Sequence, residues 1–259
     1  MAGKSTAVVK AKPAKGNLPA NINAEMEAEV AALASRLSAP SGDRIALTQA
    51  KTFKLPDGRE SPGPLDAIIV DFISYNAYYE GRYDPNNIVP PNCFAMGLEP
   101  TGLIPSKTSP DVQAEACASC WANQFGTAGK GKACQNRKLL ALLPADATED
   151  TPLMILSVSP TAIKGFDGYV GSVARAFQKP VRAVITEIGI DENSDYAKLT
   201  FGNPQACSNT QLALAHSRRE EAMQRLMTEP DFSSLNQQTS SKPKALTRKP
   251  AAKPAAKRK

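Results

Sequence analysis

The chain has 259 residues, of which 42% are hydrophobic, so it can form a core, and it has no apolar run long enough to cross a membrane. The basic first 20 residues lack the apolar segment of a signal peptide, and we expect a soluble, cytoplasmic protein. The net charge is +6. Residues 1–20 and 242–259 together carry +12, so residues 21–241 carry −6. Total charge therefore does not by itself establish nucleic-acid binding.

The first half of the chain predicts a basic arm, one helix and several strands. Residues 1–22 have the composition of a disordered segment, and a helix is expected from Asn23 because apolar residues then recur at helical spacing. Residues 44–54 and, more strongly, residues 65–75 read as strands, since apolar side chains alternate along them. Residues 93–97 predict a further short strand.

The second half predicts four more strands and two helices. The strands are expected at residues 138–143, 153–158, 181–190 and 197–201. One helix is predicted to begin at Ser159-Pro160, with the serine as N-cap. A second is predicted to begin at the capping box Ser208–Gln211 and to end near Met227.

This order predicts a mainly β protein with flanking helices, of the α+β class. A helix between the third and fourth principal strands is the arrangement of the OB-fold, so we expect an elaborated OB-like barrel. The barrel domain is predicted at residues 23–230 with a zinc-binding insertion at 93–136, and residues 231–259 form a basic tail of low complexity, expected to be disordered.

Four clustered cysteines predict one structural zinc ion. Cys117 and Cys120 form a CxxC pair, 13 residues separate Cys120 from Cys134, and 23 residues separate Cys93 from Cys117. Four soft sulfur ligands form the closed tetrahedron of a structural zinc site, which has no open position to activate water. The fifth cysteine, Cys207, is distant in sequence and is expected to take no part.

Two other interpretations of the cysteines are open. In the first, the cysteines are buried or redox-active thiols, although a thioredoxin-like pair requires a parallel αβ pattern that the sequence lacks. In the second, the cysteines hold an iron–sulfur cluster. The one histidine, His216, lies beside two arginines in the last helix and is expected at the surface.

Aromatic and basic residues near the cysteines predict contacts with single-stranded nucleic acid. Lysine and arginine bind phosphates, and bases stack on aromatic rings. The alternative is that Trp121 covers the zinc site, that the tyrosines pack on the barrel and that the lysines only solvate a loop. The predicted contact residues are Tyr75, Tyr78, Tyr79, Tyr83, Trp121, Lys130, Lys132, Arg137 and Lys138.

Catalytic motifs are missing from the sequence. Gly129–Lys132 resembles part of a phosphate-binding loop, but Ala133 stands where that motif requires serine or threonine. Neither GxSxG nor HExxH occurs. We therefore expect no enzymatic activity, with a metal-dependent nuclease as the minor alternative.

The stretches around Tyr83–Ala95, Cys117–Gly126 and Gly131–Cys134 resemble uncharacterised proteins encoded by bacteriophages and prophages. The arrangement is more loosely similar to bacteriophage single-stranded DNA-binding proteins, in which a zinc subdomain is inserted into an OB-fold. This resemblance implies binding of displaced single strands during replication or recombination in a bacterial host cell, with other replication or recombination proteins as partners. Such proteins often end in an acidic tail, whereas this chain ends in a basic one.

The leading prediction is therefore a phage-type protein that binds single-stranded DNA with little sequence preference and contains structural Zn²⁺. The alternative is a structural, nucleoid-associated or virion protein whose basic tails bind nucleic acid while its acidic body binds protein.

Overall fold

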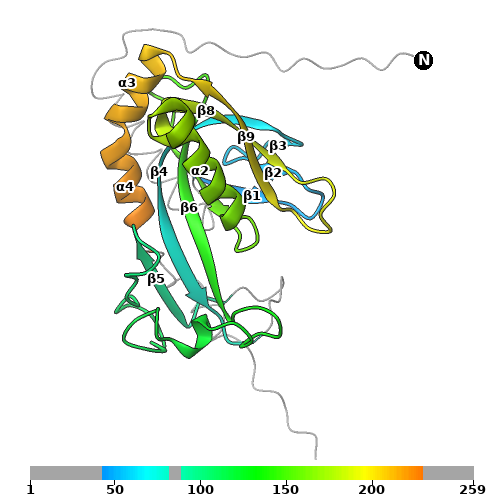
Figure 1. The fold of residues 1–259 in the computed structure, drawn as a ribbon, viewed down its shortest axis with the longest axis vertical. Helices are drawn as coiled ribbons and strands as arrows, with labels where there is room; N and C mark the ends of the chain where they lie inside the picture. Colours follow the sequence, from blue (N-terminus) through cyan, green and yellow to red (C-terminus); the bar gives the residue numbers. More distant parts are fainter. Residues whose placement is uncertain (1–42, 82–88, 230–259) are drawn as a thin grey trace, which may run out of the picture. The chain divides into compact units, whose positions relative to one another are not determined.

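The computed structural model describes residues 43–81 and 89–229. The predictions for the basic arm, the helix from Asn23, Tyr83 and the C-terminal tail lie outside these residues. In the described part, nine strands form one sheet in the order β3-β2-β1-β7-β6-β4-β8-β9, with β5 also paired to β4 (Figure 1). The strands are β1 (Arg44–Leu47), β2 (Phe53–Lys54), β3 (Glu60–Ser61), β4 (Leu65–Tyr78), β5 (Cys93–Gly97), β6 (Cys134–Pro144), β7 (Met154–Val158), β8 (Val184–Ile190) and β9 (Leu199–Ala206).

Strand β4 is the centre of the sheet. Its first residues pair with β8, its last with β5, and nearly its whole length with β6, all antiparallel. Apolar residues on both faces explain this position: Ile68 belongs to one hydrophobic cluster and Ile69 to another. A sheet buried on both faces requires such continuous apolar strands.

One face of the sheet curls around helix α2 (Ile163–Phe177). Phe166 of α2 is fully buried, and its ring meets Phe72 and Phe201 edge-on, with centroids 5.1 and 5.0 Å apart. Phe53 of β2 and Leu199 of β9, near opposite ends of the strand order, join the same cluster. The sheet is therefore curled into an open half-barrel filled by α2 (Figure 1).

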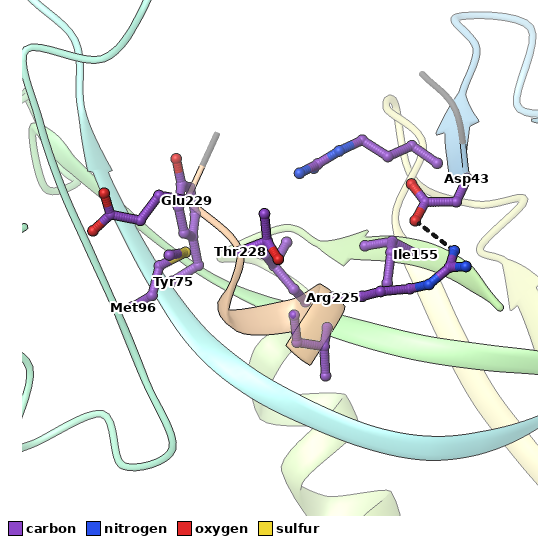
Figure 2. A pocket seen from close by; sticks show the side chains of 10 residues that line it. Asp43, Tyr75, Met96, Ile155, Arg225, Thr228 and Glu229 are labelled. Carbon is purple, nitrogen blue, oxygen red and sulfur yellow. Dashed lines mark hydrogen bonds and ion pairs between the residues drawn. The ribbon is translucent and has the colours of Figure 1, made fainter. Parts of the chain in front are cut away.

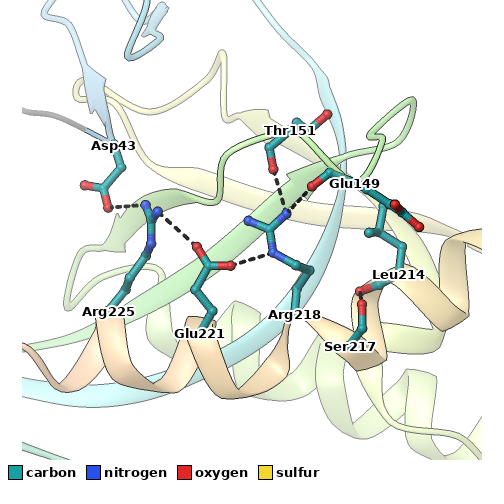
Figure 3. Close-up of polar contacts among 8 residues, drawn as sticks. All are labelled: Asp43, Glu149, Thr151, Leu214, Ser217, Arg218, Glu221 and Arg225. Atoms are coloured by element: carbon teal, nitrogen blue, oxygen red, sulfur yellow. Dashed lines mark hydrogen bonds and ion pairs between the residues drawn. The ribbon is translucent and has the colours of Figure 1, made fainter. Parts of the chain in front are cut away.

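Helices α3 (Asn209–Ser217) and α4 (Arg219–Met227) cover the other face, where Ala222 and Leu226 pack on β4 and β6. A chain of ion pairs holds α4 in place: Glu221 lies between Arg218 and Arg225, and Arg225 also reaches Asp43 at 3.2 Å (Figure 3). Arg218 donates further hydrogen bonds to the carbonyl oxygens of Glu149 and Thr151.

The mainly β class with flanking helices is confirmed, as are the strand at Cys93–Gly97 and the capping box at Ser208. Several local predictions are wrong, among them the start of the strand predicted at residues 181–190, where η2 (Val181–Ala183) is a 3-10 helix that precedes β8. Residues 44–54 contain a turn between β1 and β2 in place of one strand. Helix α2 has Ala162 as its N-cap residue, because Ser159 and Pro160 precede the helix in a separate turn. The last helix is divided at Arg218, the boundary residue of α3 and α4, whose side chain donates to the carbonyl oxygens of Glu149 and Thr151.

Candidate metal centre and nucleic-acid interface

The pairing register of β4 brings two distant cysteines together. Cys93 begins β5 and Cys134 begins β6, and both pair with Tyr78 from opposite sides of β4. Because directly paired residues project to the same face of a sheet, the side chains of Cys93 and Cys134 flank Tyr78 on one face. The sequence supported Cys93 only as the fourth ligand that a zinc site needs. The register places it near Cys134.

The CxxC pair lies on a turn that its own neighbours stabilise. The amide nitrogen of Cys117 donates to the carbonyl oxygen of Leu103, and Cys120 donates back to Cys117 at 3.4 Å. The Asn123 side chain donates to the carbonyl oxygen of Cys117 at 2.8 Å, and the following residues form the short helix η1 (Trp121–Asn123). The turn directs Cys117 and Cys120 into the same site as Cys93 and Cys134.

All four thiols are buried, with 6–8% of each residue exposed, and they line one cavity of about 10 Å³. Such a volume holds roughly one water-sized species. Across residues 43–81 and 89–229 no three histidine, cysteine, aspartate or glutamate side chains already have the geometry of a metal site. The cysteines are all free thiols.

Burial, and to a smaller degree the three neighbouring cysteines, raise the pKa of Cys134 to about 12, although Lys132 acts in the opposite direction. The pKa of Cys117 is also raised, chiefly by burial. The thiols of Cys117 and Cys134 are hence protonated at neutral pH unless a cation displaces the protons. Sulfur donors, a shared small cavity and the lack of room for a substrate fit a soft structural ion such as zinc better than a catalytic metal.

The predicted tyrosine platform is only partly exposed. Tyr75 and Tyr79 are half-buried, and burial raises the pKa of both hydroxyls, an effect that Arg137 and Arg44 partly offset. Tyr78 packs edge-on against Trp121 with ring centroids 5.4 Å apart. Trp121 itself is 49% exposed, and its Nε1 donates to Gln113. The tryptophan thus packs on Tyr78, which lines the cysteine cavity, and faces solvent at the same time.

The predicted contact residues do not all face the same way. Tyr75 lies on the side of the sheet that α4 covers, and Lys138 lies on the α2 side, where its Nζ is 3.4 Å from Asp167. Lys130 is exposed on the loop before Cys134. Lys132 lies over the ring of Phe125, with its Nζ 4.9 Å from the centroid.

Two concave surfaces on opposite faces of the sheet differ in charge. The first, which we call the arm groove, lies between the segment 125–136 and the start of α2 and has a volume of about 930 Å³. An adjoining pocket of about 240 Å³ shares Lys132, Asn136, Ile163 and Asp167 with it. The charged side chains on this face are Lys132, Lys138, Lys164 and Asp167, a formal balance of +2; Arg137 pairs with Tyr75 and projects to the α4 side of the sheet.

The second concave surface, about 400 Å³, lies on the α4 side next to Tyr75 and Met96 (Figure 2). Its charged residues are Asp43, Arg44, Arg225 and Glu229, which sum to zero, and Arg225 is already paired with Asp43. Glu229 also accepts hydrogen bonds from the hydroxyls of Ser106 and Thr108, so its carboxylate is in use. A polyanion is therefore attracted to the arm groove more strongly than to this surface.

Five residues of the site were not among the predicted contacts: Ser74, Asn76, Phe125, Lys164 and Asp167. Ser74 and Asn76 carried a signal, because they are polar residues alternating within an apolar strand. Lys164 and Asp167 gave none, since only the packing of α2 brings them to the groove.

Comparison with protein-family models, with curated proteins and with solved structures gave no match to this chain. Among the described residues, no helix is both long and apolar enough to cross a bilayer.

Proposed function

We propose that the protein binds single-stranded DNA with little sequence preference, in the arm groove. The observation that carries this proposal is the pairing of an exposed ring with a cationic channel. Phe125 is 80% exposed, Lys132 lies over it, and Lys164 and Lys138 continue the positive charge along the groove. Rings that stack bases beside cations that bind phosphates are the common elements of sequence-tolerant single-strand binding.

The strand connectivity supports an OB-like core. Strand β4 pairs with both β6 and β8, and the chain order β4, β6, β7, α2, β8, β9 corresponds to five OB strands with the helix after the third. In that correspondence the residues between β4 and β6, which include Cys93, Cys117 and Cys120 and end directly before Cys134, occupy the loop between the first two strands. OB-folds use this loop to bind oligonucleotides.

Single strands suit the groove better than duplex DNA. A base can stack on Phe125 only when its face is free, whereas the bases of a duplex are stacked on each other. Proteins that hold displaced strands during replication or recombination have this requirement, and we place the protein in that class.

We further propose that Cys93, Cys117, Cys120 and Cys134 hold one structural zinc ion. The wall of the groove includes Cys134 and the residues immediately before it. In the segment 98–133, the described structure has one three-residue helix and an isolated bridge between Ala128 and Gly131 as regular elements. A metal bound at the base of this segment would fix the position of Phe125 and Lys132.

The test is titration of folded, zinc-loaded protein with oligo-dT at several salt concentrations, following Trp121 fluorescence and the anisotropy of a labelled strand. Removing one side chain that binds a phosphate should reduce the slope of log affinity against log salt by about 0.7. We expect this reduction for Lys132→Gln. Lys54→Gln, which removes the same charge from exposed β2 outside the groove, should leave the slope unchanged. Absence of salt-sensitive binding by the folded protein refutes the proposed function.

A further inference from the structure

The pocket that adjoins the arm groove is lined by polar groups from three separate elements. Ser74 and Asn76 come from β4, Asn136 and Lys138 from β6, and Asp167 from α2. The register sets these side chains on one face, because Ser74 pairs with Lys138 and Asn76 with Asn136. The amide of Asn136 donates to Asn76 at 2.7 Å, which fixes both side chains in the pocket wall.

Ser74 lacks a partner that its burial demands. The residue is 3% exposed, and its Oγ makes no hydrogen bond to any group in the described part of the chain. A buried hydroxyl without a hydrogen bond is destabilising, and folded proteins rarely retain one without a reason. Because Ser74 lines the pocket, an acceptor bound there would satisfy it.

Lys138 is a buried cation whose ion-pair partner is largely exposed to solvent. The lysine is 7% exposed, whereas Asp167, 3.4 Å away, has 55% of its side chain exposed. The ring of Phe72, 5.2 Å from the Lys138 Nζ, supplies a second and weaker contact. Buried ammonium groups are normally held by close, buried partners, so this lysine retains capacity for an anion.

The donors and the shape of the pocket select one kind of anion. Lys132 and Lys138 oppose the single carboxylate of Asp167, a formal balance of +1, because Arg137 pairs with Tyr75 and projects to the opposite face of the sheet. A phosphate monoester carries about −1.5 to −2 near neutral pH and presents three acceptor oxygens. An internal phosphodiester presents fewer free oxygens and continues as a chain on both sides, so it matches a side pocket less well than a terminal group.

We propose that this pocket binds the terminal phosphate of a DNA strand whose following nucleotides lie in the arm groove. Ser74 donates its hydroxyl hydrogen and Lys138 an ammonium hydrogen to the phosphate oxygens, and Lys132 stands at the boundary between the pocket and the groove. The inference rests on the proposed function, because it adds a strand end to the same binding surface.

The experiment compares short oligo-dT strands that end in a 5′-phosphate, in a 3′-phosphate or in hydroxyls only, in phosphate-free buffer at constant ionic strength. One of the two phosphorylated strands should bind about tenfold more tightly than the hydroxyl-ended strand, as expected for one or two charge-assisted hydrogen bonds. Millimolar inorganic phosphate should abolish this preference and leave the affinity for the hydroxyl-ended strand unchanged.

Ser74→Ala is the informative variant, because it deletes a hydroxyl that has no partner in the described chain and should leave the thermal midpoint unchanged or higher. It should lose most of the preference for the phosphorylated strand. Lys164→Gln changes the groove and not the pocket, so it should weaken the binding of phosphorylated and hydroxyl-ended strands equally.

Equal affinity for all three strands, or a full preference retained by Ser74→Ala, overturns the pocket assignment while single-strand binding itself stands. Failure of every strand to bind contradicts the proposed function instead, so the two outcomes are distinct.

Discussion

Replacement of Phe125 by alanine separates base stacking from charge in the arm groove. The ring is 80% exposed, and the Lys132 Nζ lies over it, 4.9 Å from the centroid. Because the ring fills no core, its removal should change the free energy of unfolding by no more than about 0.5 kcal/mol. Any larger effect on DNA binding must then come from contacts made in the complex.

The magnitude follows from the value of one stacked base. A base stacked on an aromatic side chain contributes ~1–3 kcal/mol, which corresponds to a loss of affinity of roughly 5- to 150-fold for Phe125→Ala. The lysines remain in the variant, so the slope of log affinity against log salt should be that of the native protein.

The assay is fluorescence anisotropy of labelled oligo-dT at two salt concentrations, with the thermal midpoint of each variant measured in parallel. Phe125→Trp is the matched control, because indole stacks at least as well as phenyl and should preserve affinity. The reasoning is refuted if Phe125→Ala binds as tightly as the native protein, or if Phe125→Trp loses as much affinity as Phe125→Ala.

Three further predictions concern the metal, the tail and pH. Cys117→Ser should lose bound zinc and expose the segment 98–133 to protease, whereas Cys207→Ser should retain one zinc per chain by elemental analysis. Deletion of residues 242–259 should leave most of the affinity for oligo-dT at moderate salt; loss of nearly all binding would instead favour the tails as the binding element. The pKa of Glu221 is lowered, chiefly by its hydrogen bond from Arg218, from an ordinary value of 4.5. Its stabilising effect should thus be fully present above about pH 4.5 and be lost as the pH falls through the lowered value. Because its side chain is 36% exposed, Glu221→Gln should cost less than about 1 kcal/mol in denaturant unfolding at pH 7 and nothing under strongly acidic conditions.

The apolar pattern of the sequence predicted β4 and α2. The continuous apolar residues Ile68, Ile69 and Val70 located β4, and apolar residues at helical spacing, among them Phe166, located α2, because these side chains pack in the two clusters on either face of the sheet. The predicted end of β4, at Tyr75, is too early. The strand continues to Tyr78, since pairing with both β5 and β6 holds its polar residues in the ladder.

The candidate site was less accessible to sequence reasoning. The CxxC spacing pointed to Cys117 and Cys120, Cys134 followed, and Cys93 was predicted only because a fourth ligand is needed; the register that aligns it with Tyr78 brings it beside Cys134. The groove could not be derived at all, because its second wall is α2, whose packing depends on Phe72 and Phe201 far from the cysteines. A single predicted surface containing both Tyr75 and Lys138 is also inconsistent with the structure, as these residues lie on opposite faces of the sheet.

Hydrogen–deuterium exchange of the zinc-loaded chain, with and without saturating oligo-dT, tests the binding surface most directly. Slower exchange is expected in residues 121–136 and in residues 160–168, the two walls of the arm groove, with little change in α4. Protection confined to residues outside both walls, under conditions where the strand is bound, would contradict the assignment of the groove.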